Sequence, residues 1–312
     1  MIPNPCDYND LDMSGEIPAA FRIQLAADGS EHSMAATQLV RDLLLPPGSE
    51  ITILGVLTPG RPPGKTRLQD AFAQAKKILE TSAVETKSKL LHGHAAKKII
   101  EYGSEHRPDL MAIGAIGLYP ILKILLGSTA RQVVEHARWP VLLMRTPYRG
   151  LRRVLLATDG SQNSRQAAEY LAKFPLPEQT EFQVLHVKSL FPSMPSPAYG
   201  ARSLTPPIPF MLSMMPSPAE LQYVSRHAEF AEQKGQKILA ETRNVLLDAG
   251  RNVTPFVRQG DPADEILKHS EEQDIDLIVA GPRGLKGPEA WGWDSVSRKL
   301  VDYANSSLLF VH

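Results

Sequence analysis

The sequence predicts an α/β protein made of two tandem copies of one unit, each built on an open five-stranded parallel sheet. The first observation is an internal repeat, because FRIQLAADGS at residues 21–30 returns as RRVLLATDGS at residues 152–161. The second is a strict alternation of short apolar runs with helical patterns, which indicates a parallel sheet with helices on both faces. The third is a glycine-containing loop before a helix start at residues 109–129, the local order in which α/β proteins bind anions.

The two copies keep a constant register except in one segment. Asp28 and Asp159 are 159 − 28 = 131 residues apart, whereas Gly114 and Gly281 are 281 − 114 = 167 residues apart. The offset therefore grows by 167 − 131 = 36 residues, and all of this growth falls between residues 187 and 260. Repeats of this kind mark two copies of one structural unit.

The register divides the chain into an arm and two domains. We expect an N-terminal arm at residues 1–20, a first domain at 21–149, and a second domain at 150–312 with a Pro- and Met-rich insertion at about 189–218. Proline removes backbone donors, so the insertion should be an extended loop. Whether it is a plain surface loop, a lid or a partner-binding arm stays open. A helical pattern follows at residues 219–249 and ends at Gly250.

Within the first copy, each element has a local cause. The expected strands are the apolar runs at residues 21–27, 50–57, 84–91, 109–114 and 141–145. The expected helices start near Ser30, Lys65, His94 and Ser128. Asp28 can cap the helix that starts near Ser30, and Pro140 ends the last helix because it cannot continue one.

Composition excludes several classes of protein. Lys+Arg and Asp+Glu are both 34, so there is no basic footprint for nucleic acid. Cys6 is the single cysteine, which excludes an internal disulfide and a cysteine-rich zinc site and fits a cytoplasmic protein. The first residues lack the basic and apolar regions of a signal peptide. The apolar stretch from Leu110 to Gly127 is interrupted by Pro120 and Lys123, so we expect a buried strand and a loop there, not a membrane span.

The loop at the centre of the first copy has a defined spacing. Gly114 is followed by two residues, Gly117, nine residues, and then Gly127-Ser128-Thr129 at a helix start. At these residues the chain resembles the ATP-binding branch of the universal stress protein family. The resemblance covers nearly the whole chain except the N-terminal arm and the insertion.

The resemblance implies a fold and a ligand. The fold is Rossmann-like, of the adenine nucleotide alpha hydrolase type, with strand order 3-2-1-4-5 in each domain. Its ligand is ATP, with or without Mg²⁺, although AMP or another adenine nucleotide stays open. Such ligands sit where the strand order reverses, at the carboxyl ends of the first and fourth strands. The role implied is regulatory, in a stress response.

The resemblance also implies which residues bind the nucleotide. In the family, the residue matching Asp28 meets the adenine end, the one matching Val56 packs on the base, and the glycine loop wraps the ribose and phosphates. Each has a structural alternative, because Asp28 could cap a helix, Val56 could be core, and Ser128 or Thr129 could be a helix cap. The full predicted set is Ala27, Asp28, Val56, Gly114, Gly117, Gly127, Ser128 and Thr129.

No catalytic constellation is visible in the sequence. There is no Gly-x-Ser-x-Gly and no His-Glu-x-x-His. PGRPPGKT at residues 59–66 has one residue too few for a phosphate-binding P-loop, and its prolines remove the N–H groups that such a loop needs. Weak ATP hydrolysis, and a nucleotide-free scaffold that binds a partner through the insertion, both stay open as alternatives.

The second copy departs from the pattern at one point. It keeps Asp159, Gly281 and Gly284, but Asp294 replaces the glycine before Ser295. A carboxylate at that helix start would cap the helix and repel phosphate. We therefore expect one competent site, in the first domain, and leave open whether the second domain binds anything.

The resemblance finally implies how the two domains meet. In the family, two domains pair through their last strands. Here the strands at residues 141–145 and 308–312 would be antiparallel neighbours within one chain, forming an intramolecular pseudo-dimer. A homodimer of the whole chain stays open. The only ligand expected is an adenine nucleotide, with neither nucleic acid nor membrane as a partner.

Overall fold

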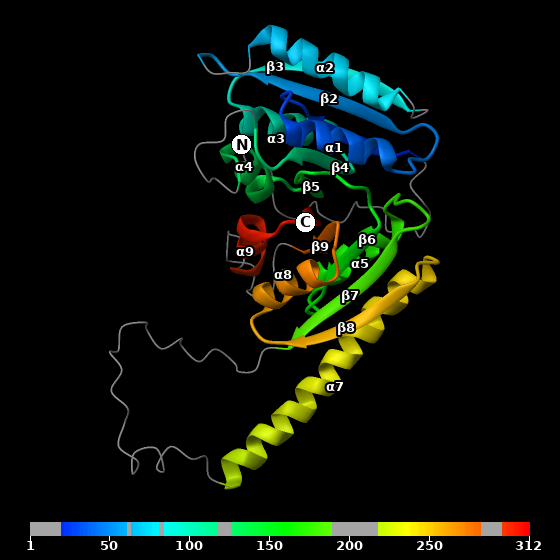
Figure 1. Ribbon diagram of the computed structural model, residues 1–312, viewed down its shortest axis with the longest axis vertical. Coiled ribbons are helices and arrows are strands. Elements are labelled where there is room, and N and C mark those ends of the chain that lie inside the picture. The colour runs from blue at the N-terminus through cyan, green and yellow to red at the C-terminus, as the bar shows by residue number, and fades with distance from the viewer. Residues whose placement is uncertain (1–19, 61–63, 81–83, 118–125, 189–217, 282–294) are drawn as a thin grey trace, which may run out of the picture.

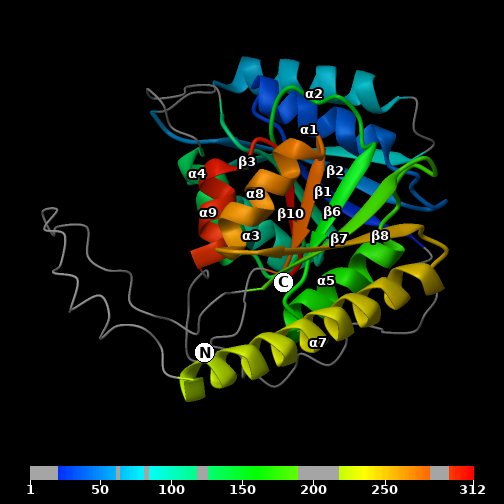
Figure 2. The same ribbon diagram turned by 60° about the horizontal axis from the view of Figure 1, so that its bottom comes forward.

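One sheet runs through the molecule, with helices on both of its faces (Figures 1 and 2). The structure is a computed structural model that describes residues 20–60, 64–80, 84–117, 126–188, 218–281 and 295–312. The described strands form a ten-stranded sheet in the order β3-β2-β1-β4-β5-β10-β9-β6-β7-β8. The expected order 3-2-1-4-5 therefore occurs in the first half and again in the second, and the two five-stranded sheets are joined edge to edge.

The first half follows the alternation that the sequence predicts. Its elements are β1 (Arg22–Ala26), α1 (Glu31–Asp42), β2 (Glu50–Leu57), α2 (Lys65–Leu79), β3 (Glu85–His92), α3 (Ala95–His106), β4 (Leu110–Gly114), α4 (Ser128–His136) and β5 (Val141–Met144). The strands of this half pair in parallel.

The second half repeats the series. Its elements are β6 (Arg153–Ala157), α5 (Gln162–Lys173), β7 (Glu181–Lys188), α7 (Pro218–Asp248), β8 (Val253–Gln259), α8 (Pro262–Glu272), β9 (Leu277–Ala280), α9 (Ser295–Tyr303) and β10 (Ser307–Phe310). These strands also pair in parallel. Within the described residues, no helix combines the length and apolar character that crossing a membrane requires.

The two halves meet through an antiparallel pair of strands at the centre of the sheet, as the sequence led us to expect. Leu142 of β5 faces Leu309 of β10, and Leu143 faces Leu308. All four side chains are buried. Each strand would otherwise be an apolar sheet edge, and an exposed edge of that kind invites association with other chains.

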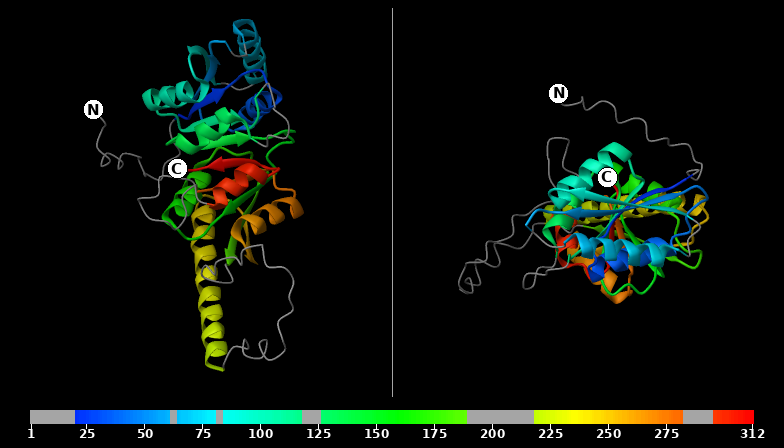
Figure 3. Two further views of the ribbon diagram at one scale, coloured as in Figure 1. Left: turned by 90° about the vertical axis from the view of Figure 1, so that its left-hand side faces the viewer. Right: turned by 90° about the horizontal axis from the view of Figure 1, so that it is seen from above.

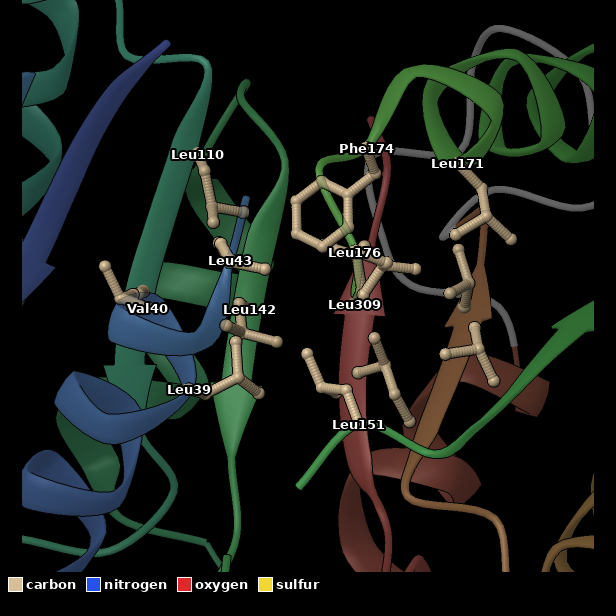
Figure 4. Packing of buried hydrophobic residues seen from close by; sticks show 14 of the residues in the cluster. Leu39, Val40, Leu43, Leu110, Leu142, Leu151, Leu171, Phe174, Leu176 and Leu309 are labelled. Atoms are coloured by element: carbon tan, nitrogen blue, oxygen red, sulfur yellow. The ribbon is translucent and has the colours of Figure 1, made fainter. Parts of the chain in front are cut away.

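Side chains on both faces of the sheet reinforce this joint. Figure 4 shows Leu142 and Leu309 on its two sides, with Phe174 between the halves. The Tyr170 hydroxyl donates to the Asp109 carbonyl at 2.9 Å, across the joint. On the opposite face, Arg131 of α4 forms an ion pair with Asp302 of α9. Each face has one hydrophobic core that extends across both halves, one under α1, α2, α5 and α7 and the other under α3, α4, α8 and α9.

The main difference between the halves is the length of one helix. α7 has 31 residues, whereas its counterpart α2 has 15. At 1.5 Å per residue, α7 is about 46 Å long and α2 about 22 Å. Figures 1 and 3 show α7 continuing well beyond the sheet. The insertion that precedes α7 lies outside the described residues.

A buried polar cluster under α8 was not predicted from the sequence. The His269 side chain is fully buried, and its Nε2 lies 2.8 Å from Oε1 of Gln183. Arg258 Nε donates to His269 Nδ1 at 3.1 Å and also contacts Glu272. Because arginine can only donate, Nδ1 must be an acceptor and the ring is neutral with its proton on Nε2. Burial, and then the nearby Arg258 cation, lower the pKa of His269 below its usual 6.5.

A first prediction concerns the joint. A chain that ends at Arg149 exposes β5 and should dimerise through it, reproducing the β5–β10 pair with two copies of β5. Leu143→Lys should weaken that dimer at least tenfold, because a charge would enter an apolar contact. Sedimentation velocity at tens of micromolar protein measures the dimer of the truncated chain and its weakening by Leu143→Lys. The matched control is Ser104→Lys on the exposed part of α3. A monomeric truncated chain would refute the prediction.

A second prediction concerns pH. The unfolded chain protonates His269 near its usual pKa of 6.5, whereas the folded chain does so only at lower pH. Stability should therefore be full above about pH 7 and fall as the pH drops through 6.5 toward the lowered pKa. His269→Gln should lose about 1–3 kcal/mol at pH 7.5 but show a shallower fall in acid. Urea denaturation from about pH 7.5 to 5.5 checks this, and equal slopes for the two proteins would contradict it.

Candidate functional site

The site begins at the carboxyl end of β1. Oδ1 of Asp28 accepts the N–H of Ser30 at 2.9 Å, and Gly29 between them has a φ of 76°, which favours glycine. Ser30 is the N-cap of α1, and its hydroxyl accepts the N–H of Ser33. The alternative role of Asp28 as the helix cap is therefore wrong, because Ser30 fills that role. Asp28 Oδ2 lies 2.9 Å from where a Cβ on Gly117 would be.

Gly114 is the last residue of β4 and lies under α1. A Cβ at this position would be 2.8 Å from the His32 carbonyl carbon and 2.8 Å from the Ser33 nitrogen. Glycine is therefore required here for helix packing. Gly114 brings α1 against the end of β4 and so fixes Asp28 beside the loop that follows β4.

Gly127 brings the start of α4 to the same place. It is the N-cap of α4, it provides no side-chain cap, and its N–H donates to the Ala115 carbonyl at 2.7 Å. A Cβ on Gly127 would be 3.3 Å from that oxygen and 3.6 Å from the Gly117 nitrogen. Ser128 and Thr129 are the first two residues of α4, so neither of them is its N-cap.

The other two predicted residues lie in the sheet beside this point. Ala27 is buried, and its N–H donates to the Leu54 carbonyl. Val56 near the end of β2 is 9% exposed and belongs to the core under α3 and α4. The loop at residues 118–125 lies outside the described residues. The structure thus brings Asp28, Gly117 and the start of α4 together, with Ala27 and Val56 at the neighbouring strand ends.

The second half repeats the contacts at the ends of its first and fourth strands. Asp159 Oδ1 accepts the N–H of Ser161 at 2.9 Å, and a Cβ on Gly281 would be 2.6 Å from the Asn163 carbonyl oxygen. Ser295 is the exposed first residue of α9. Gly284 and Asp294 lie outside the described residues. Asp159 and Gly281 therefore have the same kinds of contact as Asp28 and Gly114.

The second half contains a cavity that the sequence did not predict. A cavity of about 80 Å³ opens at the carboxyl ends of β6, β7 and β9, the place that corresponds to the first-half site. Beside it, the Thr158 hydroxyl lies 3.2 Å from that of Thr242 and 3.3 Å from that of Ser164. Thr158 stands where the first half has Ala27, and this substitution is one sequence signal of the difference. Among the described residues, no group of three His, Cys, Asp or Glu side chains could hold a metal ion.

Two curated proteins are similar to parts of the chain. The universal stress protein YxiE of Bacillus subtilis is 27% identical over 164 residues, which is 51% of this chain and 97% of YxiE. The universal stress protein Slr1230 of Synechocystis is 29% identical over 147 residues, 46% of this chain and 48% of Slr1230.

Solved structures match most of the length of the chain. A universal stress protein from Archaeoglobus fulgidus is 18% identical, with 93% of this chain and 95% of that one covered and a TM-score of 0.58. A putative universal stress protein from Pseudomonas aeruginosa is 13% identical, with coverages of 93% and 92% and a TM-score of 0.61. At these identities the structures support the fold alone.

A family model completes the comparison. The model described as the universal stress protein family matches residues 21–145 and again residues 211–312. The second match starts after β7, so β6, α5 and β7 are assigned to the second copy by strand pairing. The chain therefore belongs to the universal stress protein family, as a tandem member with two copies of the domain.

Proposed function

We propose that this protein is a cytoplasmic regulatory protein that binds an adenine nucleotide, and that its ATP site lies in the first half. One observation carries the proposal. Three residues that are far apart in the sequence, Asp28, Gly117 and Gly127, converge where β1 and β4 end. Asp28 Oδ2 lies 2.9 Å from the position that a Cβ on Gly117 would occupy. This is the point where the strand order reverses, and ligands of open α/β sheets bind at such points.

The residues present fit an adenine nucleotide. The start of α4 has no side-chain cap, so the N–H groups and hydroxyls of Ser128 and Thr129 suit phosphate oxygens. Gly117 and Gly127 leave space that a Cβ would fill, so that a ligand can approach the backbone. Asp28 offers a carboxylate oxygen to the adenine end, and Val56 offers an apolar surface to the base. Mg²⁺ would arrive with the phosphates of ATP.

The sequence of the second half supports a single ATP site. Asp294 stands there at the position of Gly127, at the start of the equivalent helix. A carboxylate at a helix start competes with phosphate for the same N–H groups and repels its charge. Direct assays distinguish the proposal from two other functions. A weak ATPase would release phosphate from ATP, and a nucleotide-free scaffold would show no ATP affinity.

The test is a calorimetric titration of the full chain with Mg-ATP. We expect about one site per chain, and Gly127→Asp should lower the affinity at least tenfold, about 1.4 kcal/mol. The reason is that the new carboxylate would cap α4 and repel the phosphates. Two equivalent sites in the wild type, or unchanged affinity in the variant, would count against the proposal.

Two control variants distinguish the effect of the new negative charge of Gly127→Asp from the effect of its added side-chain atoms. Gly127→Ala adds the same Cβ, 3.3 Å from the Ala115 oxygen, without the charge. It should lose much less affinity than Gly127→Asp. Gly64→Asp places an identical charge at the start of α2, another glycine N-cap without a side-chain cap, where nothing lies within 4 Å. It should leave ATP binding unchanged.

A further prediction compares two glycines of the loop. Gly117→Ala meets only the end of the Asp28 side chain, which can rotate away. It should fold with nearly wild-type stability but bind ATP more weakly, since the carboxylate is displaced. Gly114→Ala meets the backbone of α1 and should lose about 1–3 kcal/mol of stability. Thermal denaturation and ATP titration of both variants check this, and equal stability losses would contradict it.

A further inference from the structure

The helix α7 begins with an extension that its counterpart α2 lacks. The repeat offset of 167 residues places Lys65, the first residue of α2, opposite Glu232 of α7, so residues 218–231 are additional. Lys188, the last residue of β7, forms an ion pair with Glu232. The extension therefore lies beyond the end of that strand, and at 1.5 Å per residue it is about 21 Å long (Figures 1 and 3).

One row of positions runs along the whole of α7 at the spacing of a coiled-coil seam. Residues that recur after three and then four positions lie on one side of a helix, and strict repetition of this spacing is typical of paired helices. The row, which we call the α7 seam, is apolar or small at every position and consists of Leu221, Val224, Ala228, Ala231, Gly235, Ile238, Thr242 and Val245.

The second part of the α7 seam packs on the sheet. Ile238 and Thr242 are buried, and the Thr242 hydroxyl lies 3.2 Å from that of Thr158. A Cβ on Gly235 would be 3.0 Å from Cδ2 of His186. The extension continues the same row of positions past the sheet, where Figures 1 and 3 show no other described helix or strand beside it.

We propose that two copies of this chain associate through their extensions, as an antiparallel pair of α7 helices. A narrow seam of strict three-and-four spacing suits a second helix, whereas a helix that covers a sheet buries a broader stripe. A second copy provides an identical seam, and a two-fold axis brings the two seams together. The strands β5 and β10 are already paired within one chain, so a dimer of the full chain needs a different surface.

The sizes of the residues favour the antiparallel orientation. With the two-fold axis at Arg226, Leu221 of one copy lies opposite Ala231 of the partner subunit. Val224 then lies opposite Ala228 of the partner subunit. Each larger residue meets a small one, which allows the two helices to interdigitate at an even separation. A parallel pair would instead place the larger residues opposite each other at one end and the alanines opposite each other at the other end.

Charged residues beside the seam favour the same orientation. Glu220 and Lys234 each come one residue before a seam position, so they lie along the same flank of α7. The antiparallel arrangement places Glu220 opposite Lys234 of the partner subunit, and the two-fold axis repeats this pair. Charges at such flanking positions set the orientation of paired helices. In a parallel pair Glu220 would lie opposite Ser225 of the partner subunit, and Lys234 opposite Leu239 of the partner subunit.

The fixed base of α7 lowers the cost of this association. An isolated helix as short as the extension is marginally stable in water. Here the helix continues into a part that is held on the sheet by the buried side chains of Leu239 and Leu246. The extension is thus helical before the two copies meet, and binding has little further order to impose on it.

The first test is sedimentation equilibrium of the full chain. We expect a dimer at tens of micromolar protein. Val224→Lys places a charge on the α7 seam and should weaken the dimer at least tenfold. The matched control Gln233→Lys adds the same charge at an exposed position on the opposite side of α7 and should dimerise as the wild type does. Circular dichroism checks that both variants are folded.

The second test exchanges the charges that flank the seam. Glu220→Lys or Lys234→Glu alone places like charges opposite each other twice, so each variant should dimerise roughly threefold or more weakly than the wild type. An equimolar mixture of these two variants restores both opposite-charge pairs and should dimerise as the wild type does. This recovery is specific to the antiparallel pairing of two copies.

Several results would overturn the inference. They are a monomeric full chain at tens of micromolar, equal association of Val224→Lys and Gln233→Lys, and a mixture of the two charge variants that is no more dimeric than either variant alone. A full chain that dimerises only after residues 190–216 are replaced by a glycine-serine segment of equal length would also overturn it, because the insertion would then occupy the seam.

Discussion

The antiparallel pair of β5 and β10 is the contact on which the rest of the structure depends. Each half is a parallel sheet that ends in a short apolar strand, and such a strand is unstable as an exposed edge. Joining them in one chain raises their effective concentration to roughly millimolar. Leu142 and Leu309 then bury each other, and one core on each face serves both halves.

This geometry also separates the carboxyl strand ends of the two halves. Because β5 and β10 run in opposite directions, the carboxyl ends of the two parallel sheets lie at opposite edges of the combined sheet. Ligands of such sheets bind at the carboxyl ends. The candidate site of the first half and the cavity of the second half therefore lie apart. The Arg131–Asp302 pair links α4 to α9, the two helices that begin at these positions.

Much of the fold could be predicted from the sequence, because the repeat and the spacing of apolar residues can be read along the chain without knowing which distant segments meet. The strand at residues 50–57 and the antiparallel joint are confirmed. The sequence could not decide whether Asp28 caps a helix or contacts a ligand, because the answer depends on which side chain reaches the free N–H groups. In the structure Ser30 caps α1, and the second carboxylate oxygen of Asp28 lies near Gly117. The His269 cluster and the cavity were missed since both depend on side chains from distant segments. The cap at Asp261, followed by Pro262, could have been found, since this pair is a common helix start.

The helix starts of the molecule differ in whether the chain itself caps them. A helix start always presents several N–H groups without helical partners, and either the chain or a ligand must satisfy them. At Gly127 the chain provides no side chain for them, so an anion can bind there. At Asp261 the chain provides its own carboxylate, worth about 1 kcal/mol as a cap, which a phosphate would have to displace against its charge. An acidic cap such as Asp261 therefore occupies N–H groups that stay uncapped at His94, the start of the equivalent helix α3, while the sheet and the strand order are the same in both halves.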